Sequence, residues 1–246
     1  MSKPAFSAVS KESLSDSVYR QLADKILRGE LPAGEPLPAE RELSETLGVN
    51  RGAVREAIKR LQQARLVAVR QGGNSVVLDY RAEGGLELLP SLLVNGQGQL
   101  DTAVVRSIMA MRSALAPDIA AAAVKGGAAL ADELDALLAP MRRDGDLRVL
   151  QDQALAFWHK LVERGGNIAF RLAFNSMTRT YTQVWDALRL VLQAEFRDLD
   201  NLGAIAAAVR RGDAEAARRH GRLHVEIGRG ALEQALDAME GRQRLQ

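Results

Sequence analysis

Residues 36–61, PLPAERELSETLGVNRGAVREAIKRL, decide the fold of the N-terminal third of this chain. Leu43 and Leu47 lie four positions apart and therefore share one face of a helix. Gly48 can adopt the left-handed conformation that ends a helix, and Asn50 has the side chain of an N-cap for the next one. The pattern predicts two short amphipathic helices joined by a tight turn. In this helix-turn-helix arrangement the second helix can enter a DNA major groove.

The second of these helices carries a local positive charge. Its apolar residues, which include Val54, Ala57 and Leu61, recur with the period of a helix and form a stripe that we expect to be buried. The whole chain has a formal net charge of only +2, yet six basic residues lie between positions 50 and 70 against one acid, Glu56. A solvated helix face is the alternative, but a basic helix in this setting favours neutralisation of DNA phosphates. The basic residues are Arg51, Arg55, Lys59, Arg60, Arg65 and Arg70.

A short β-hairpin is predicted directly after this helix. The β-branched runs 66–70 and 75–78 flank the turn 71–74, which has the sequence QGGN. A hairpin in this position is typical of the wing of a winged helix, and a glycine at its tip lets the backbone approach DNA closely. A hairpin that only packs against the helices is the alternative. One further amphipathic helix is expected upstream, over residues 15–28.

These segments resemble the winged-helix DNA-binding domain of the GntR family of bacterial transcription factors. The shared motif, PxGxxLPxERELxxxxGVxRxxVREAIxRL, runs over residues 32–61. The resemblance implies DNA contacts at Arg41, Arg51, Arg55 and the wing-tip Gly72. The other predicted DNA contacts are Asn50 and Gly52, which depart from the common family pattern, and Gln71 beside the wing-tip glycine.

Length and composition indicate two domains. We expect a winged helix over residues 1–79, a linker with a short helix over 80–100, and a larger helical domain over 101–246. Cysteine is absent, which excludes disulfides, thiolate metal sites and a cysteine nucleophile. The chain opens with no signal-peptide pattern and has no run of 18 apolar residues, so we expect a cytoplasmic protein with no membrane partner.

The C-terminal part is expected to be all α-helical. Alanine, leucine and arginine are frequent after residue 100, whereas β-branched residues are sparse. The predicted fold class is therefore mainly α, with a small β-hairpin wing in the N-terminal domain and an antiparallel helical bundle at the C-terminus. The six expected helices run over residues 101–124, 128–142, 146–164, 167–193, 196–211 and 213–239.

This second part resembles the FCD domain, the ligand-sensing helical bundle of the FadR subfamily of GntR regulators. Most FCD domains hold a metal through one aspartate and three histidines. The resemblance places those ligand positions at Ala154, Trp158, Leu202 and His224, so only one retains a ligand side chain. Because metals need several converging donor atoms, we expect no metal cofactor and an apolar lining instead. A rearranged site built on His220 and His224, four residues apart, with His159 nearby is the alternative.

The resemblance also implies an effector pocket. The loss of metal ligands and the stretches 84–89 and 165–177 look most like the fatty-acid-responsive members of the FadR subfamily, which release DNA when they bind long-chain acyl-CoA. Arg112 stands where FCD domains keep an arginine that faces the pocket, although an intrahelical or inter-helix salt bridge would also explain it. The predicted effector contacts are Arg112, Ala154, Trp158, Asn175, Tyr181, Trp185, Leu202 and His224.

The predicted function is a ligand-responsive bacterial transcription regulator. As a homodimer it would read a pseudo-palindromic operator on double-stranded DNA and be released by acyl-CoA or a similar hydrophobic effector. A regulator that senses a small carboxylate or a sugar acid, with or without a metal, is the alternative. An enzyme is not expected, because the sequence contains no paired-acid motif, catalytic triad, P-loop or GxGxxG motif.

Overall fold

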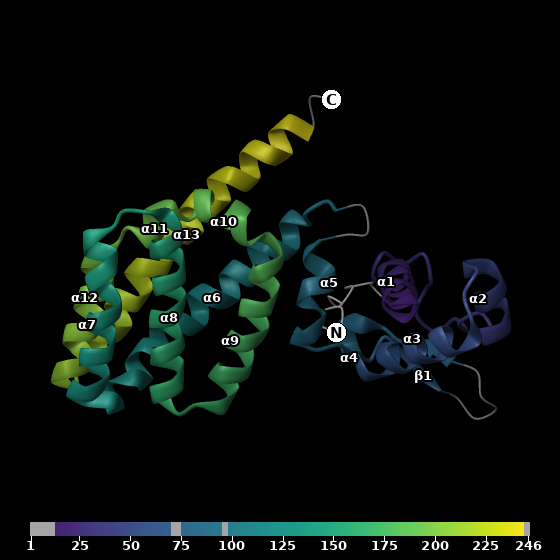
Figure 1. The fold of residues 1–246 in the computed structure, drawn as a ribbon, viewed down its shortest axis with the longest axis horizontal. Coiled ribbons are helices and arrows are strands. Elements are labelled where there is room, and N and C mark those ends of the chain that lie inside the picture. Colours follow the sequence, from purple (N-terminus) through teal and green to yellow (C-terminus); the bar gives the residue numbers. More distant parts are fainter. Residues whose placement is uncertain (1–12, 70–74, 95–97, 244–246) are drawn as a thin grey trace, which may run out of the picture. The chain divides into compact units, whose positions relative to one another are not determined.

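The computed structural model describes residues 13–69, 75–94 and 98–243 (Figure 1). The chain forms two compact units, Met1–Leu100 and Asp101–Gln246, and each is described by itself. The fold class is mainly α with one two-stranded sheet, as predicted.

The first unit contains the predicted winged helix. Strands β1 and β2 are antiparallel, with Val67 opposite Val77 and Val69 opposite Ser75. The tip of the hairpin, which includes the predicted DNA contacts Gln71 and Gly72, lies outside the described residues. The elements are α1 (Leu14–Leu27), α2 (Glu40–Leu47), α3 (Arg51–Gln63), β1 (Val67–Val69) and β2 (Ser75–Val77).

The turn between α2 and α3 forms from local hydrogen bonds. Gly48 ends α2 with φ of 64°, a left-handed conformation that glycine adopts without steric cost. The Ser44 hydroxyl donates to the carbonyl of Val49 at 2.6 Å. The side-chain oxygen of Asn50 accepts from the backbone N–H of Ala53 at 2.9 Å and so caps α3. The sequence pattern therefore predicted this turn correctly.

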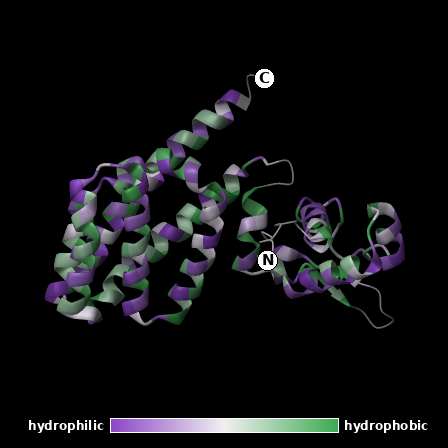
Figure 2. Cartoon of the chain, in the orientation of Figure 1, coloured by the Kyte–Doolittle hydropathy of each residue, from purple (hydrophilic) through white to green (hydrophobic). Residues whose placement is uncertain are grey.

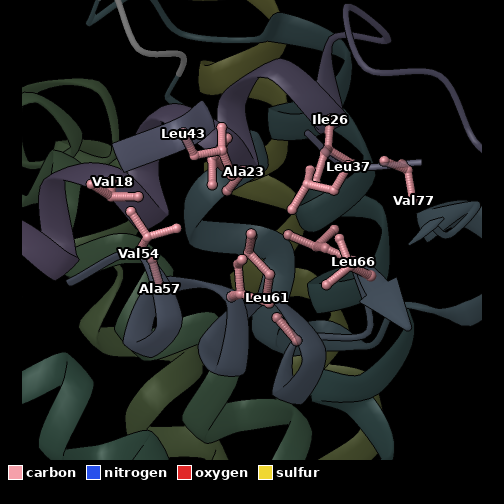
Figure 3. Close-up of a cluster of buried hydrophobic side chains, with 14 of the residues drawn as sticks. Val18, Ala23, Ile26, Leu37, Leu43, Val54, Ala57, Leu61, Leu66 and Val77 are labelled. Carbon is pink, nitrogen blue, oxygen red and sulfur yellow. The ribbon is translucent and has the colours of Figure 1, made fainter. Parts of the chain in front are cut away.

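One apolar cluster holds the three helices and the hairpin together. Val54, Ala57 and Leu61 on α3 are fully buried and meet side chains from α1, α2 and both strands (Figure 3). Burial of a Val or Leu side chain contributes about 1.5–3 kcal/mol each, so this cluster is the main source of stability for the unit. It fixes which face of α3 points away from the core.

The segment expected as a linker belongs to the first unit. Its described residues form three short helical elements between positions 80 and 93, and Leu88 of this segment is part of the same apolar cluster as α1 and α3. Val94 and Leu100 form an antiparallel bridge. The elements are α4 (Tyr80–Glu83), η1 (Leu86–Leu88) and α5 (Leu89–Leu93).

The second unit is a helical bundle, with no strand among its described residues. Helices α6 and α13 pack along each other, and α12 packs against both α7 and α13. Figure 1 shows α13 continuing beyond the other helices of the bundle, and Figure 2 shows apolar and polar residues alternating around each helix. The elements are α6 (Thr102–Ala122), η2 (Ala123–Gly126), α7 (Gly127–Arg143), α8 (Leu147–Gly165), α9 (Ile168–Tyr181), η3 (Thr182–Val184), α10 (Trp185–Val191), α11 (Gln193–Phe196), α12 (Leu199–Arg211) and α13 (Ala214–Gln243).

The expectation of one continuous helix over residues 167–193 is wrong. The helix ends at Tyr181, and Val184 has φ of −125° and ψ of 22°, outside the helical region. The side-chain amide of Gln151, on α8, donates to the carbonyl of Trp185 at 2.9 Å. This long-range bond satisfies a backbone carbonyl at the break, which no local sequence pattern could indicate.

An 18-residue window within Thr102–Arg143 has a mean hydropathy of 1.3, which suits a membrane-crossing helix by length and composition, although the sequence has no uninterrupted run of 18 apolar residues. Two observations place it instead among the core helices of a bundle. It is divided by η2, and its two helices pack against others of the same unit, α6 against α13 and α7 against α12. Arg106, on α6, also pairs with Asp237 of α13 at 2.8 Å.

Arg65 supports a prediction about stability. It follows the end of α3 with φ of 53°, a left-handed conformation that costs a residue with a Cβ atom about 1–2 kcal/mol. We expect Arg65→Gly to raise the free energy of unfolding by about 1 kcal/mol, measured by urea denaturation. Arg65→Ala, which keeps the Cβ atom, should change it by less than about 0.5 kcal/mol. Equal stabilisation by alanine would mean that the side-chain charge, not the backbone, is responsible.

Candidate DNA-binding surface and effector pocket

The predicted DNA contacts that lie within the described residues gather around the turn between α2 and α3. Arg51 and Gly52 are the first two residues of α3 and are exposed. Arg55 follows one turn later on the same helix, and Arg41 lies on α2 with 73% of its side chain exposed. Because the apolar stripe of α3 faces the core, Arg51 and Arg55 point toward solvent from the N-terminal end of that helix.

The arginines of this surface differ in how they are held. Arg55 donates to the carboxylate of Glu40 at 2.6 Å, and Arg41 lies 3.6 Å from Glu45. Such exposed ion pairs contribute about 0–1 kcal/mol, so a phosphate can replace either acid at little cost. Arg51 has no ion pair with any other described residue. Its guanidinium is therefore available to a base edge or a phosphate without breaking a contact.

Arg60 lies on the same helix but packs against another helix of the unit. Its guanidinium pairs with Asp16 and lies over the ring of Tyr19 at 4.2 Å from the centroid, so it joins α3 to α1. Hydrogen bonds from Ser13 and then from Arg60 lower the pKa of the Asp16 carboxyl. The basic run of α3 therefore divides into arginines that face solvent and one arginine that packs within the unit.

The second unit contains a pocket between α6, α8 and α9. Its lining is apolar apart from Arg112, Thr178 and the polar atoms of two aromatic side chains. The cavity measures about 60 Å³, which is room for a few water molecules or methylene groups, since one water needs about 10–15 Å³. The lining residues are Arg112, Leu115, Ala116, Ile119, Leu155, Trp158, Phe174, Met177, Thr178 and Tyr181.

A buried ion pair lies at this pocket. Arg112 on α6 donates through Nη1 to Glu195 Oε2 at 2.8 Å and through Nη2 to Glu195 Oε1. The side chains are 15% and 2% exposed, respectively. Burial alone would lower the pKa of Arg112, but the charge and hydrogen bonds of Glu195 raise it above its ordinary value. The two charges therefore neutralise each other in an environment that would exclude either one alone.

A chain of polar side chains continues from Glu195. His224 is fully buried; its Nε2 lies 3.6 Å from Glu195 Oε1, and its Nδ1 lies 3.0 Å from Asp198 Oδ2. The Asp198 carboxylate also accepts from the Asn201 amide at 2.9 Å. Burial would raise the pKa of Asp198, but the bonds from His224 and Asn201 outweigh it and lower that pKa. His220 completes the chain, because its Nδ1 lies 2.8 Å from Asn201 Oδ1.

The metal site of FCD domains does not fit these residues. Ala154, Trp158 and Leu202 are buried at three of the four ligand positions and offer no metal-binding oxygen or imidazole nitrogen. The two nitrogens of His224 face different carboxylates on opposite sides of its ring. Among the described residues, no group of three or more His, Asp or Glu side chains is placed to hold a metal ion.

The alternative metal site at His220 and His224 does not form either. His220 Nδ1 faces Asn201 and its Nε2 lies 3.4 Å from Arg219 Nη2, whereas His224 Nδ1 faces Asp198. His159 packs edge-on against Phe174 at 4.8 Å between ring centroids, and burial is the main cause of its lowered pKa. The three histidines therefore do not converge on a common point.

The structure brings only some of the predicted effector contacts to the pocket. Arg112, Trp158 and Tyr181 line it, whereas His224 lies behind the ring of Trp158, 6.1 Å away between centroids. The remaining predicted contacts are not among its lining residues: Ala154, Asn175, Trp185 and Leu202.

Sequence reasoning missed Glu195 and Asp198. Both lie in the short region between α10 and α12, where helical periodicity gives little information. The packing of α11 against α13 shows that Glu195 is buried.

Comparison with known proteins identifies the family. Residues 14–77 match the model of the gntR family of bacterial regulatory proteins, and residues 107–227 match the FCD domain. The HTH-type transcriptional regulator Mce2R of Mycobacterium tuberculosis is 38% identical over 240 residues, which cover 97% of this chain and all of that protein. The chain belongs to the GntR family. It is a DNA-binding transcription regulator with a C-terminal FCD domain, and not an enzyme.

Other GntR-family relatives refine the predicted resemblance. The fatty acid metabolism regulator of Serratia proteamaculans is 28% identical over 163 residues, which cover 66% of this chain and 67% of that protein. The likeness to fatty-acid regulators is thus weaker and less complete than the likeness to Mce2R. The solved structure of the regulator Lar of Listeria monocytogenes shares the fold, with a TM-score of 0.54 at 18% identity over 92% of this chain and 99% of that one.

Tyr181 leads to a prediction about pH. Burial raises the pKa of Tyr181 to about 12, with smaller opposing effects from Arg112 and Glu195. The unfolded phenol ionises near pH 10, so the stability that this group contributes is complete below about pH 10 and is lost as the pH rises toward 12. We expect Tyr181→Phe to remove the transition of highest pH from an ultraviolet tyrosine titration of the folded protein. Loss of a transition near pH 10 instead would contradict this assignment.

Proposed function

We propose that this GntR regulator binds a pseudo-palindromic operator in the cytoplasm as a homodimer, with the N-terminal end of each α3 in the major groove. The observation that carries this proposal is Arg51, exposed at the first position of a capped helix and free of ion pairs with the other described residues. Arg41 and Arg55 lie near it, and each forms an exposed ion pair with a glutamate that a DNA phosphate can replace. Two such helices in a dimer supply the two contacts that a half-site pair requires.

The contribution of a base contact by Arg51 can be distinguished experimentally from the contribution of its positive charge. We expect Arg51→Ala to weaken binding to the operator by about tenfold or more, because a bidentate contact to guanine contributes about 1–3 kcal/mol. Binding to random DNA should weaken much less, because the variant loses only one positive charge that interacts with DNA phosphates. Fluorescence anisotropy at fixed salt measures both affinities.

Arg81→Ala is the matched control for this test. Arg81 is an exposed arginine in the same unit, on α4 and away from the turn between α2 and α3. The control should reduce both affinities slightly and equally. Equal losses on operator and random DNA for Arg51→Ala would instead assign that residue to the phosphate backbone.

The second unit is proposed to hold a hydrophobic effector of the acyl type, and binding of this effector releases the operator. Apolar side chains from three helices line the pocket, and an acyl chain is complementary to such a lining. A volume of about 60 Å³ holds only a few methylene groups, so a longer chain requires the helices to move apart. Effector binding would therefore favour a second conformation of the bundle, as a population shift requires.

A hydrophilic sugar acid is the less favoured effector. It would need several polar or cationic groups around its hydroxyls, and Arg112 is the one charged side chain among the pocket-lining residues described. That arginine is already paired with Glu195. The surroundings therefore favour a ligand that is mostly hydrocarbon.

Release by an acyl effector can be measured directly. We expect long-chain acyl-CoA at micromolar concentration to lower the anisotropy of labelled DNA from the upstream region of the regulator's own gene, with chelator present. Free CoA at the same concentration should have no effect, because it lacks the acyl chain. Tight DNA binding that no acyl-CoA alters would discard this effector class while leaving the DNA-binding proposal intact.

A further inference from the structure

Glu195 occupies the anion-binding face of Arg112, the charged side chain among the described residues that line the pocket. Both terminal nitrogens of Arg112 donate to it, in the two-bond geometry with which a guanidinium also binds a ligand carboxylate. A second carboxylate placed beside Glu195 would bring two negative charges to one guanidinium in a buried site, which is unfavourable. An anionic ligand can therefore reach Arg112 only if Glu195 leaves it.

Spare hydrogen-bonding groups surround this ion pair. Among the described residues, neither Trp158 Nε1 nor His224 Nε2 has a hydrogen-bond partner, although both atoms are buried. Trp158 lines the pocket, and its indole N–H can only donate, so it is suited to a ligand that brings an acceptor. A carboxylate has two oxygens and about four acceptor sites, enough for Arg112 and for such a donor together.

The position of Glu195 depends on small local features. It lies on α11, a helix of four residues, Gln193–Phe196, in which the N–H of Phe196 donates to Leu192 and the N–H of Arg197 to Gln193. Its carboxylate fits against Gly228 of α13, where a Cβ atom would lie 1.7 Å from Glu195 Oε2. Movement of a short helix costs less than movement of a long one, because fewer contacts must break. The close fit against Gly228 holds Glu195 on Arg112 when no ligand is bound, and the short length of α11 is the feature that would let it move when a ligand binds.

We propose that this pocket also accepts the free acid, an aliphatic carboxylic acid whose carboxylate displaces Glu195 from Arg112, while its hydrocarbon chain lies against Leu115, Ile119 and Met177. This inference rests on the proposed function only in taking this pocket as the effector site, and it names the head group of the ligand. Glu195 is then an internal competitor that lowers the affinity of the regulator for such an acid.

Removal of this competitor provides the test. Decanoate and decan-1-ol have the same chain and differ in the head group, and binding of each to the full-length protein can be measured by calorimetry. Glu195→Gln removes the competing charge and leaves Arg112 free for the ligand. We expect this variant to bind decanoate about tenfold tighter or more than the wild type, with the affinity for decan-1-ol unchanged. Its melting temperature should also rise more with decanoate than that of the wild type.

Glu133→Gln is the matched control. Glu133 is an ion-paired acid of the same unit, held by Lys160 and Arg164 outside the pocket, and hydrogen bonds from these two bases lower its pKa. This variant should bind both ligands as the wild type does. If Glu195→Gln fails to fold, Glu195→Asp draws the carboxylate back by one methylene and should also bind decanoate more tightly. Unchanged or weaker decanoate binding by the folded variant, or an equal gain for the alcohol, overturns the proposal.

These measurements contain no DNA, so their outcome is separate from that of the proposed function. A gain in decanoate affinity together with an operator that is never released would retain the displacement of Glu195 and reject the control of DNA binding by this pocket. Operator release by an acyl ligand without any gain in the Glu195→Gln variant would retain the regulator and reject the displacement.

Discussion

Burial of one face of α3 is the constraint on which the DNA-binding unit depends. Val54, Ala57 and Leu61 are fully buried, and a helix that hides these positions must turn its remaining face toward solvent. The exposed positions include Arg51 and Arg55, so packing of the core and presentation of the arginines are one event. A loss of core packing would therefore weaken DNA binding without touching any group that contacts DNA.

The second unit depends on a different constraint, which is that two charges buried in its interior must neutralise each other. Removing one partner of a buried ion pair typically costs about 3–5 kcal/mol, and Arg112 and Glu195 are both nearly inaccessible to solvent. The pair joins α6 to α11, and His224 and Asp198 extend the contact to α13 and the start of α12. Protein carboxylates and an arginine thus link the helices at a place where a metal would join them in many FCD domains.

The two units explain why the family can be recognised from the sequence whereas the chemistry of the effector cannot. The helix-turn-helix motif is continuous in sequence, and relatives such as Mce2R match this chain over nearly its whole length. The pocket is assembled from residues that lie far apart in the sequence, on α6, α8 and α9. A shared family therefore shows the fold and the DNA-binding function, while the ligand has to be argued from this pocket.

The sequence alone determined the winged helix, because its information is local. The left-handed turn at Gly48, the cap at Asn50 and the apolar period of α3 each involve residues within a few positions of one another. It also indicated a helical second unit without the FCD metal ligands. Only the tertiary structure decided the break after Tyr181, the inclusion of residues 80–100 in the first unit, and the burial of Glu195 against Gly228. The physical reason is distance along the chain: Glu195 lies 83 positions from Arg112, and only packing of the bundle brings them into contact.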